Sequence, residues 1–258
     1  MKIVALYEGS YSVDASKKFI SFNPDVDKVS DRPASLFIFI QPFLVKTEKD
    51  LILIDTGLGY QNDNNELILH QNIIKAGYLP ENITKVLMSH LHYDHSGGMV
   101  VERNGKLEVS FENAEYFVQR GEWETAYSKN SSSYKTEIFD VLQRSGQLVF
   151  IDGDGTINDE ISYEITGGHT EYHQVFYIKE NDETVFFGAD VVPEPEQLQR
   201  KFVAKYDLDG RKSMELRIEF AQKAGQGNWI CLFYHAKRKA IAKVRIENEQ
   251  IFIDDLKP

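Results

Sequence analysis

Cysteine is almost absent from this chain of 258 residues, and the single Cys231 excludes an intramolecular disulfide. Cys231 lies in the apolar segment 229–233, so we expect a small buried side chain and no nucleophilic role. No apolar run approaches the roughly 20 residues of a membrane helix, and the apolar stretch near Met1 is too short for the core of a signal peptide. The sequence therefore predicts a soluble cytoplasmic protein without a membrane partner.

Basic side chains are also in the minority, with 29 Lys and Arg against 40 Asp and Glu, which gives a formal net charge of −11. Nucleic acids and anionic lipids are bound through clustered Lys and Arg. The only short basic run is Lys237-Arg238-Lys239. We therefore expect a small-molecule substrate and no nucleic-acid partner.

Internal repeats, low-complexity tracts and Pro- or Ser-rich linkers are lacking as well, so one domain over residues 1–258 is expected. Short apolar runs rich in β-branched and aromatic residues predict strands at 3–7, 36–45, 51–55, 86–89, 116–118, 148–151, 161–165, 175–178, 185–187, 230–234, 240–244 and 250–253. Helical periodicity is confined to 66–76, 136–144 and 212–224. Many strands with helices interspersed suggest two sheets between helical layers, but periodicity alone supports only an α/β fold.

Histidine is scarce, with seven residues, yet three of them fall in the run His90-Leu91-His92-Tyr93-Asp94-His95. Four potential metal ligands in one loop suit zinc, iron or manganese, whereas magnesium and calcium prefer oxygen ligands. The alternative is a polar loop with histidines by chance. Metal binding explains both the spacing of this run and the distant ligand candidates described next.

Further candidate ligands come directly after strand-like segments. His169, Asp190 and His235 end such segments, as does Asp55, and His90 follows another. Strand ends that meet at one edge of a sheet form a rigid rim for polar groups. The alternatives are a hydrogen-bonded histidine at 169 or 235, a cap at Asp190 and a simple turn at Asp55. Glycines near each site fit close backbone approach or ordinary turns equally well.

The other aromatic and histidine side chains receive simpler interpretations. His173, four residues after His169, is predicted to support a ligand or to have a structural role. His70 is predicted to be exposed on the surface of an amphipathic helix. Trp123, Tyr127 and Tyr134 lie in a Ser-rich stretch expected to be irregular, where they would line a pocket or pack beneath a loop.

The ordered set of Asp55-Thr56-Gly57, the HxHxDH run, Gly168-His169-Thr170, Gly188-Ala189-Asp190 and Tyr234-His235 resembles the metallo-β-lactamase superfamily. The set spans residues 55–235, which is most of the chain. The resemblance implies a four-layer αββα sandwich, with two mixed β-sheets flanked by helices and a dinuclear metal site at their shared edge.

The resemblance also implies roles, residue by residue. His90, His92 and His169 would hold the first ion, Asp94, His95 and His235 the second, and Asp190 would bridge the two. Asp55 resembles the acid that fixes a ligand histidine through its other ring nitrogen. Two divalent ions, zinc first and iron or manganese as alternatives, would activate a hydroxide, and Asp94 would also pass a proton to the leaving oxygen.

Within the superfamily the chain is most similar to the lactonase and organophosphate-hydrolase-like group. The similarity lies in Pro42-Phe43-Leu44-Val45, the segment 53–59, and Asp207-Leu208-Asp209 followed by Arg217. The tyrosine that many such lactonases carry shortly after the bridging aspartate is missing, because Val191-Val192-Pro193-Glu194 stands there. Hydrolysis of an ester or lactone is the expected activity. A homodimer is an expectation drawn from these relatives alone.

Three other activities compete with this interpretation. A phosphotriester or phosphodiester hydrolase shares the motifs, although the acidic charge disfavours a nucleic-acid substrate. A mononuclear-iron persulfide dioxygenase keeps similar ligands and would hold one iron. A thioester-cleaving glyoxalase needs a helical C-terminal region, whereas the pattern of the 23 residues after His235 predicts strands.

Overall fold

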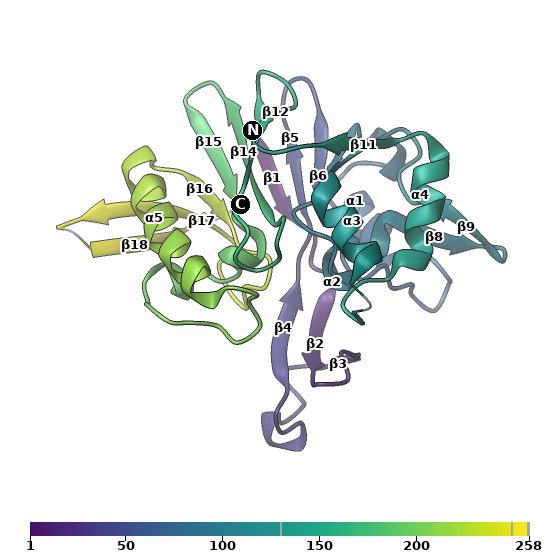
Figure 1. Cartoon of the computed structure of the whole chain (residues 1–258), viewed down its shortest axis with the longest axis horizontal. Coiled ribbons are helices and arrows are strands. Elements are labelled where there is room, and N and C mark those ends of the chain that lie inside the picture. Colours follow the sequence, from purple (N-terminus) through teal and green to yellow (C-terminus); the bar gives the residue numbers. More distant parts are fainter. Residues whose placement is uncertain (130, 249, 257–258) are drawn as a thin grey trace.

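Two mixed β-sheets pack against each other in the computed structural model, which describes residues 1–129, 131–248 and 250–256 (Figure 1). The first sheet has the order β1 (Lys2–Ala5), β5 (Phe43–Lys46), β6 (Leu51–Ile54), β7 (Lys85–Leu87), β10 (Glu115–Gln119) and β11 (Leu148–Ile151). The second has the order β12 (Gly155–Thr156), β13 (Ile161–Ile165), β14 (Gln174–Glu180), β15 (Glu183–Phe187), β16 (Ile230–Leu232), β17 (Ile241–Glu247) and β18 (Gln250–Asp255).

Helices cover the outer face of each sheet. The first sheet carries α1 (Ile68–Lys75), α3 (Arg120–Ser128) and α4 (Phe139–Ser145), and the second carries α5 (Gly210–Gly227), which lies on the opposite side of the molecule (Figure 1). The short α2 (Tyr93–Ser96) follows β7. The 3-10 helices are η1 (Val29–Asp31), η2 (Pro80–Asn82), η3 (Gly97–Met99), η4 (Thr136–Ile138), η5 (Ala189–Val191) and η6 (Pro195–Leu198). This is the expected four-layer αββα arrangement.

The buried side chains explain why four layers form. On β6, Leu51 and Leu53 join the apolar cluster beneath α1, α3 and α4, while Ile52 and Ile54 join the cluster between the sheets. Alternate side chains of a strand point to opposite faces, so a strand without polar residues is buried on both sides. A third cluster, which includes Phe220 and Cys231, lies between the second sheet and α5. The predicted burial of Cys231 is confirmed.

A three-stranded arm extends from the sandwich (Figure 1). It consists of β3 (Phe19–Ser21), β2 (Gly9–Val13) and β4 (Leu36–Ile40). The sequence predicted one strand over residues 36–45, but the chain breaks at Gln41-Pro42, and β4 and β5 belong to different sheets. Proline lacks the N–H that a continuous ladder needs, which explains the break.

Other predictions of local structure were wrong. The stretch around Trp123 is helix α3, not an irregular segment, and Trp123 is buried in the core. His70 is buried, because its ring packs against Phe111 and its Nε2 lies 2.9 Å from the carbonyl oxygen of Ser110. The hairpin of β8 (Val100–Arg103) and β9 (Lys106–Val109) was not predicted. None of the described helices is long and apolar enough to cross a membrane.

Candidate metal centre

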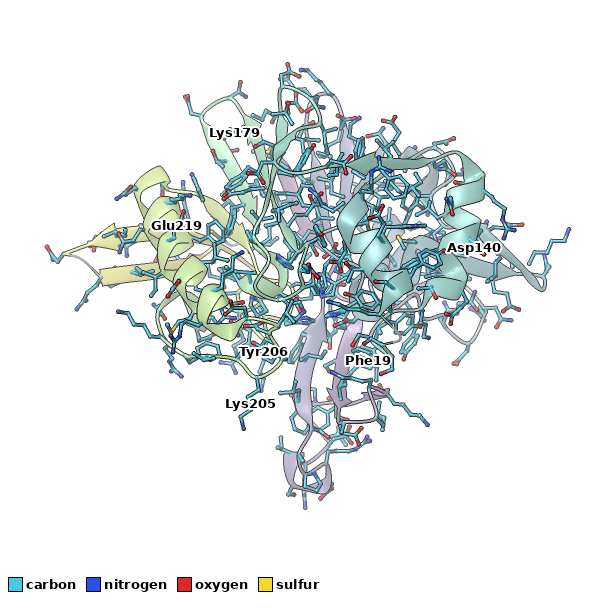
Figure 2. All side chains as sticks on the ribbon, viewed as in Figure 1. Phe19, Asp140, Lys179, Lys205, Tyr206 and Glu219 are labelled. Atoms are coloured by element: carbon cyan, nitrogen blue, oxygen red, sulfur yellow. The ribbon has the colours of Figure 1, made fainter. Side chains whose placement is uncertain are left out.

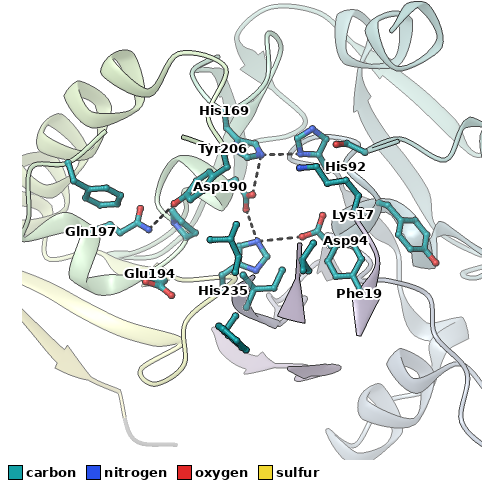
Figure 3. A pocket seen from close by; sticks show the side chains of 18 of the residues that line it. Lys17, Phe19, His92, Asp94, His169, Asp190, Glu194, Gln197, Tyr206 and His235 are labelled. Carbon is teal, nitrogen blue, oxygen red and sulfur yellow. Dashed lines mark hydrogen bonds and ion pairs between the residues drawn. The ribbon is translucent and has the colours of Figure 1, made fainter. Parts of the chain in front are cut away.

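The sandwich brings the predicted ligands together from both sheets. His90, His92, Asp94 and His95 follow β7 in the first sheet, His169 lies between β13 and β14, Asp190 lies in η5 after β15, and His235 follows β16. Figure 3 shows His92, Asp94, His169, Asp190 and His235 directed toward one space. All seven predicted ligands therefore meet at one edge of the two sheets.

These side chains form two neighbouring ligand groups. One nitrogen of each of His90, His92 and His169 lies within 4.8 Å of the others. The same limit holds for the ligand atoms of Asp94, His95 and His235, and also for His90, His95 and Asp190. Two of these three sets coincide with residue sets that the resemblance implied, and the third takes one histidine from each of them.

Asp190 stands between the two groups and turns one oxygen toward each. Its Oδ2 lies 3.2 Å from Nε2 of His169 and its Oδ1 lies 3.1 Å from Nε2 of His235 (Figure 3). The same Oδ1 lies 3.1 Å from Nε2 of His95. A carboxylate shared by two ions needs this placement.

The unsatisfied atoms of the site fit bound cations. Among the described residues, Nε2 of His95 and Oδ1 of Asp190 are buried and make no hydrogen bond, although they lie only 3.1 Å apart. On the other side, Nδ1 of His92 lies 3.1 Å from Nε2 of His90 and 3.0 Å from Nε2 of His169. Buried polar atoms normally have partners, and a shared cation accepts the lone pairs of all these atoms. Nitrogen and carboxylate donors in this number suit zinc, iron or manganese.

Burial and the neighbouring charges shift the pKa values of the site residues in different directions. Burial, reinforced by the neighbouring imidazoles, holds the pKa of His90 and of His92 well below the ordinary value, so both rings stay neutral. Burial alone would raise the pKa of Asp190, but His235, His95 and His169 around it hold that pKa well below its ordinary value. Burial would lower the pKa of His95, but Asp190, Asp94 and Asp55 raise it well above the ordinary value. A proton and a metal ion compete for the same nitrogen there.

In His95 and His90, the ring nitrogen that faces away from the candidate metal centre lies within hydrogen-bond distance of a neighbouring side chain. His95 Nδ1 donates to Asp55 Oδ2 at 2.7 Å, and the role that the resemblance implied for Asp55 stays a prediction. Asp55 also accepts from the hydroxyl of Ser89 at 2.7 Å, and that hydroxyl lies 3.1 Å from Nδ1 of His90. One buried carboxylate thus orients a histidine of each group.

Two further partners were missed by sequence reasoning. His169 Nδ1 donates to Asp207 Oδ1 at 3.0 Å, and Asp207 is paired with the buried Arg217 at 3.0 Å. His235 Nδ1 donates to the backbone carbonyl of Phe39 at 2.8 Å. The sequence similarity pointed to Asp207 and Arg217 but did not predict that Asp207 would contact His169. The backbone carbonyl of Phe39, near the end of β4, leaves no signal in the sequence.

His173 lies beside the first group and outside all three ligand sets. It is fully buried, its Nδ1 is 2.8 Å from the hydroxyl of Thr166, and its ring centre is 5.3 Å from that of His90. The predicted supporting role stays a prediction.

A cavity of about 580 Å³ opens over the two ligand groups. The arm supplies an apolar wall, which includes Phe19, Leu36 and Ile38, and the segment 193–206 supplies a mixed wall, which includes Glu194 and Tyr206. Figure 2 places Phe19 on the arm, and Figure 3 shows Phe19 and Tyr206 on opposite sides of the candidate ligands. The arm, which the sequence did not predict, therefore shapes access to the site.

Comparison with known proteins agrees with this geometry. The sequence model described as "Metallo-beta-lactamase superfamily" matches residues 38–236. An N-acyl homoserine lactonase of a Bacillus species is 32% identical over 156 residues, covering 53% of this chain and 57% of the relative. The N-acyl homoserine lactonase of Bacillus thuringiensis is 30% identical with the same coverage. The chain thus matches little more than half the length of these curated relatives.

Solved structures with the same fold are also found. A probable metal-dependent hydrolase from Staphylococcus aureus has a TM-score of 0.78 at 20% identity, covering 100% of this chain and 97% of that one. AidC, described as a dizinc quorum-quenching lactonase, has a TM-score of 0.71 at 20% identity, covering 99% and 94%. At such identities the similarity establishes the architecture.

Proposed function

The chain belongs to the metallo-β-lactamase superfamily, and on that basis we propose that it is a metal-dependent hydrolase that opens an ester or lactone bond of a small molecule. The position of Asp190 carries the proposal, because its two oxygens face two separate histidine groups. The lactonase relatives support the choice of substrate class.

In this proposal His90, His92 and His169 hold one ion, Asp94, His95 and His235 hold the other, and Asp190 lies between them. Two bound divalent ions would supply an activated water near neutral pH and polarise the oxygen under attack. Asp94 lines the cavity, with Oδ2 3.8 Å from His95 Nε2 and 3.7 Å from His235 Nε2. From there its carboxylate would accept a proton from the attacking water and pass it to the leaving oxygen.

The walls of the cavity support a substrate with an apolar acyl part. Phe19, Leu36 and Ile38 of the arm offer the surface that such a chain needs. Tyr206 brings a phenol into the cavity, with its ring centre 6.1 Å from that of His169. Burial raises the pKa of Tyr206 to about 12, so the hydroxyl remains a hydrogen-bond donor at neutral pH. We propose that Tyr206 contacts the substrate in place of the tyrosine that is missing after Asp190.

The number of bound ions separates this proposal from the single-iron alternative, because a one-ion dioxygenase keeps similar ligands. The second set formed by Asp94, His95 and His235 supports two ions. Lys17, Arg200 and Lys201 also line the cavity and would complement an anionic phosphodiester, so phosphodiester hydrolysis is a second activity to assay beside phosphotriester hydrolysis.

Elemental analysis of protein purified without added metal or chelator is the first test. We expect about two ions per chain, and turnover of lactones or aryl esters in a panel that also contains phosphotriesters. A single iron per chain, with oxygen consumption in the presence of a persulfide, would contradict the proposal.

Replacement of the bridging residue is the sharper test. Asp190→Ala should abolish hydrolysis and lower metal content while circular dichroism stays that of the native fold. Asp152→Ala is the matched control, because Asp152 is an exposed carboxylate paired with Arg120 on the surface. Full metal content and turnover in Asp190→Ala would disprove the bridging role.

A further inference from the structure

Glu122 is a buried carboxylate that neither ligand group uses. It lies on α3 and is 1% exposed. Its Oε1 accepts from the backbone N–H of Leu91 and from the hydroxyl of Tyr134, both at 3.2 Å. Its Oε2 accepts from the hydroxyl of Thr170 at 2.8 Å. All three donors are neutral.

Each partner of Glu122 belongs to, or touches, a segment that carries the first ligand group. Leu91 separates His90 from His92, and Thr170 directly follows His169. The ring of Tyr134 lies 5.1 Å from the ring of His92. One carboxylate thus joins two segments that are about eighty positions apart in the chain and that contribute all three histidines of this group.

The cost of burial argues against a purely packing role for Glu122. Its helix neighbours Trp123 and Ala126 fill the core, and an apolar residue at 122 would avoid the desolvation of a carboxylate, which costs several kcal/mol. Three hydrogen bonds offset part of that cost.

We propose that Glu122 is a positioning residue that fixes the loop 90–92 against the loop 169–170 and thereby sets the affinity of the first ligand group for its ion. The inference rests on the proposed function only in assuming that these histidines bind a metal. It requires no particular substrate.

Metal affinity gives a readout independent of turnover. Zinc binding is measured by competition with a chromophoric chelator, and the cobalt-substituted protein is examined by visible spectroscopy. Both are carried out in a His235→Ala background, so that the second group is incomplete. We expect Glu122→Ala to weaken binding about 10–100-fold, the usual effect of losing a partner that orients ligands, and to alter the cobalt spectrum.

Two variants discriminate positioning from general damage. Glu122→Gln should bind nearly as the parent does, because its amide oxygen still accepts from Leu91 and Tyr134 while its amide nitrogen donates to Thr170. Asp50→Ala should also leave affinity unchanged. Asp50 is a buried carboxylate at the far end of β6, bonded to Thr84 at 2.8 Å and Lys85 at 2.9 Å.

Parental affinity and spectrum in Glu122→Ala would overturn the inference, as would an equal loss in Asp50→Ala or in Glu122→Gln. If Glu122→Ala does not fold, Thr170→Val removes the 2.8 Å bond alone and must still weaken zinc binding. Normal affinities in these variants alongside active lactone hydrolysis would refute only the positioning role. Weakened zinc binding without any hydrolysis would refute only the proposed substrate class.

Discussion

At the scale of single residues, the ring nitrogens that face away from the candidate metal centre determine how firmly its histidines are positioned. His169 is held by Asp207, and Asp207 is held in turn by Arg217, which is 1% exposed. Arg217 also donates to the carbonyl oxygens of Val191, beside Asp190, and of Phe202. This chain of contacts connects α5 with both the first group and the bridging residue.

Asp207→Ala should therefore weaken both metal binding and the fold. Loss of a partner that orients a ligand costs about 10–100-fold in metal affinity, and a buried guanidinium left without its carboxylate costs about 3–5 kcal/mol. Asp209→Ala is the control, since it removes only the N-cap bond to Lys212 and should cost about 1 kcal/mol. Urea unfolding and zinc competition measure the two effects, and equal behaviour of both variants would contradict the assignment.

His70 gives a residue-scale prediction away from the site. Burial lowers its pKa from 6.5 to about 4, so the unfolded chain takes up this proton first as the pH falls. The contribution of His70 to stability is thus complete above pH 6.5 and is lost progressively toward pH 4; between pH 7 and pH 5 the loss is about 2 kcal/mol.

Urea unfolding of wild type and His70→Gln at pH 7 and pH 5 tests this. The free energy of unfolding should fall by about 2 kcal/mol less in the variant than in wild type over this interval. The same pH dependence in both proteins would show that His70 is exposed, as its helical periodicity first indicated.

At the scale of elements, the segment 55–59 and the turn after α2 fit together through glycines. A Cβ on Gly98 would lie 2.1 Å from the carbonyl oxygen of Thr56, and one on Gly97 would lie 2.3 Å from that of Leu58. Thr56 N–H donates to the carbonyl oxygen of His95 at 2.7 Å. Close backbone approach therefore explains these glycines, and it holds Asp55 next to His95.

Gly98→Ala should separate these two segments, because a backbone carbonyl cannot move aside as a flexible side chain can. We expect a cost of about 1–3 kcal/mol and weaker binding of the ion held by Asp94, His95 and His235. Gly105→Ala is the control: its φ of +74° carries strain, but its Cβ would meet nothing within 4 Å. Thermal unfolding and metal analysis of both variants test this prediction. A larger loss of metal in Gly105→Ala than in Gly98→Ala would contradict the interpretation.

The elements and candidate ligands differ in how far the sequence could predict them. The density of the run 90–95 and the strand ends before His169, Asp190 and His235 marked the seven candidate ligands, whereas their grouping and the four-layer order were inferred from a resemblance. The sequence did not predict the three-stranded arm, because Pro42 divides one apolar run between two sheets. Helix α3 was not predicted, because the buried Glu122 and Thr125 interrupt its apolar face. Partners such as the Phe39 carbonyl depend on tertiary contacts alone.

At the scale of the whole molecule, the candidate centre joins the two halves of the sandwich. One half contributes His90, His92, Asp94 and His95, and the other contributes His169, Asp190 and His235. Ions bound only by the native arrangement stabilise it by mass action, so their removal should lower the thermal midpoint. The stabilisation should rise with the concentration of free metal.

Acid offers the most direct global test of a histidine-rich centre. An imidazole binds metal only when neutral, so protons displace the ions as the pH falls below the ordinary imidazole value of about 6.5. Dialysis at steps from pH 7.5 to 4.5 should release metal in parallel with a falling thermal midpoint. Return to pH 7.5 with zinc should restore both if acid removes ions without destroying the fold. Unchanged metal content well below pH 5 would mean that the ions are not held by these histidines.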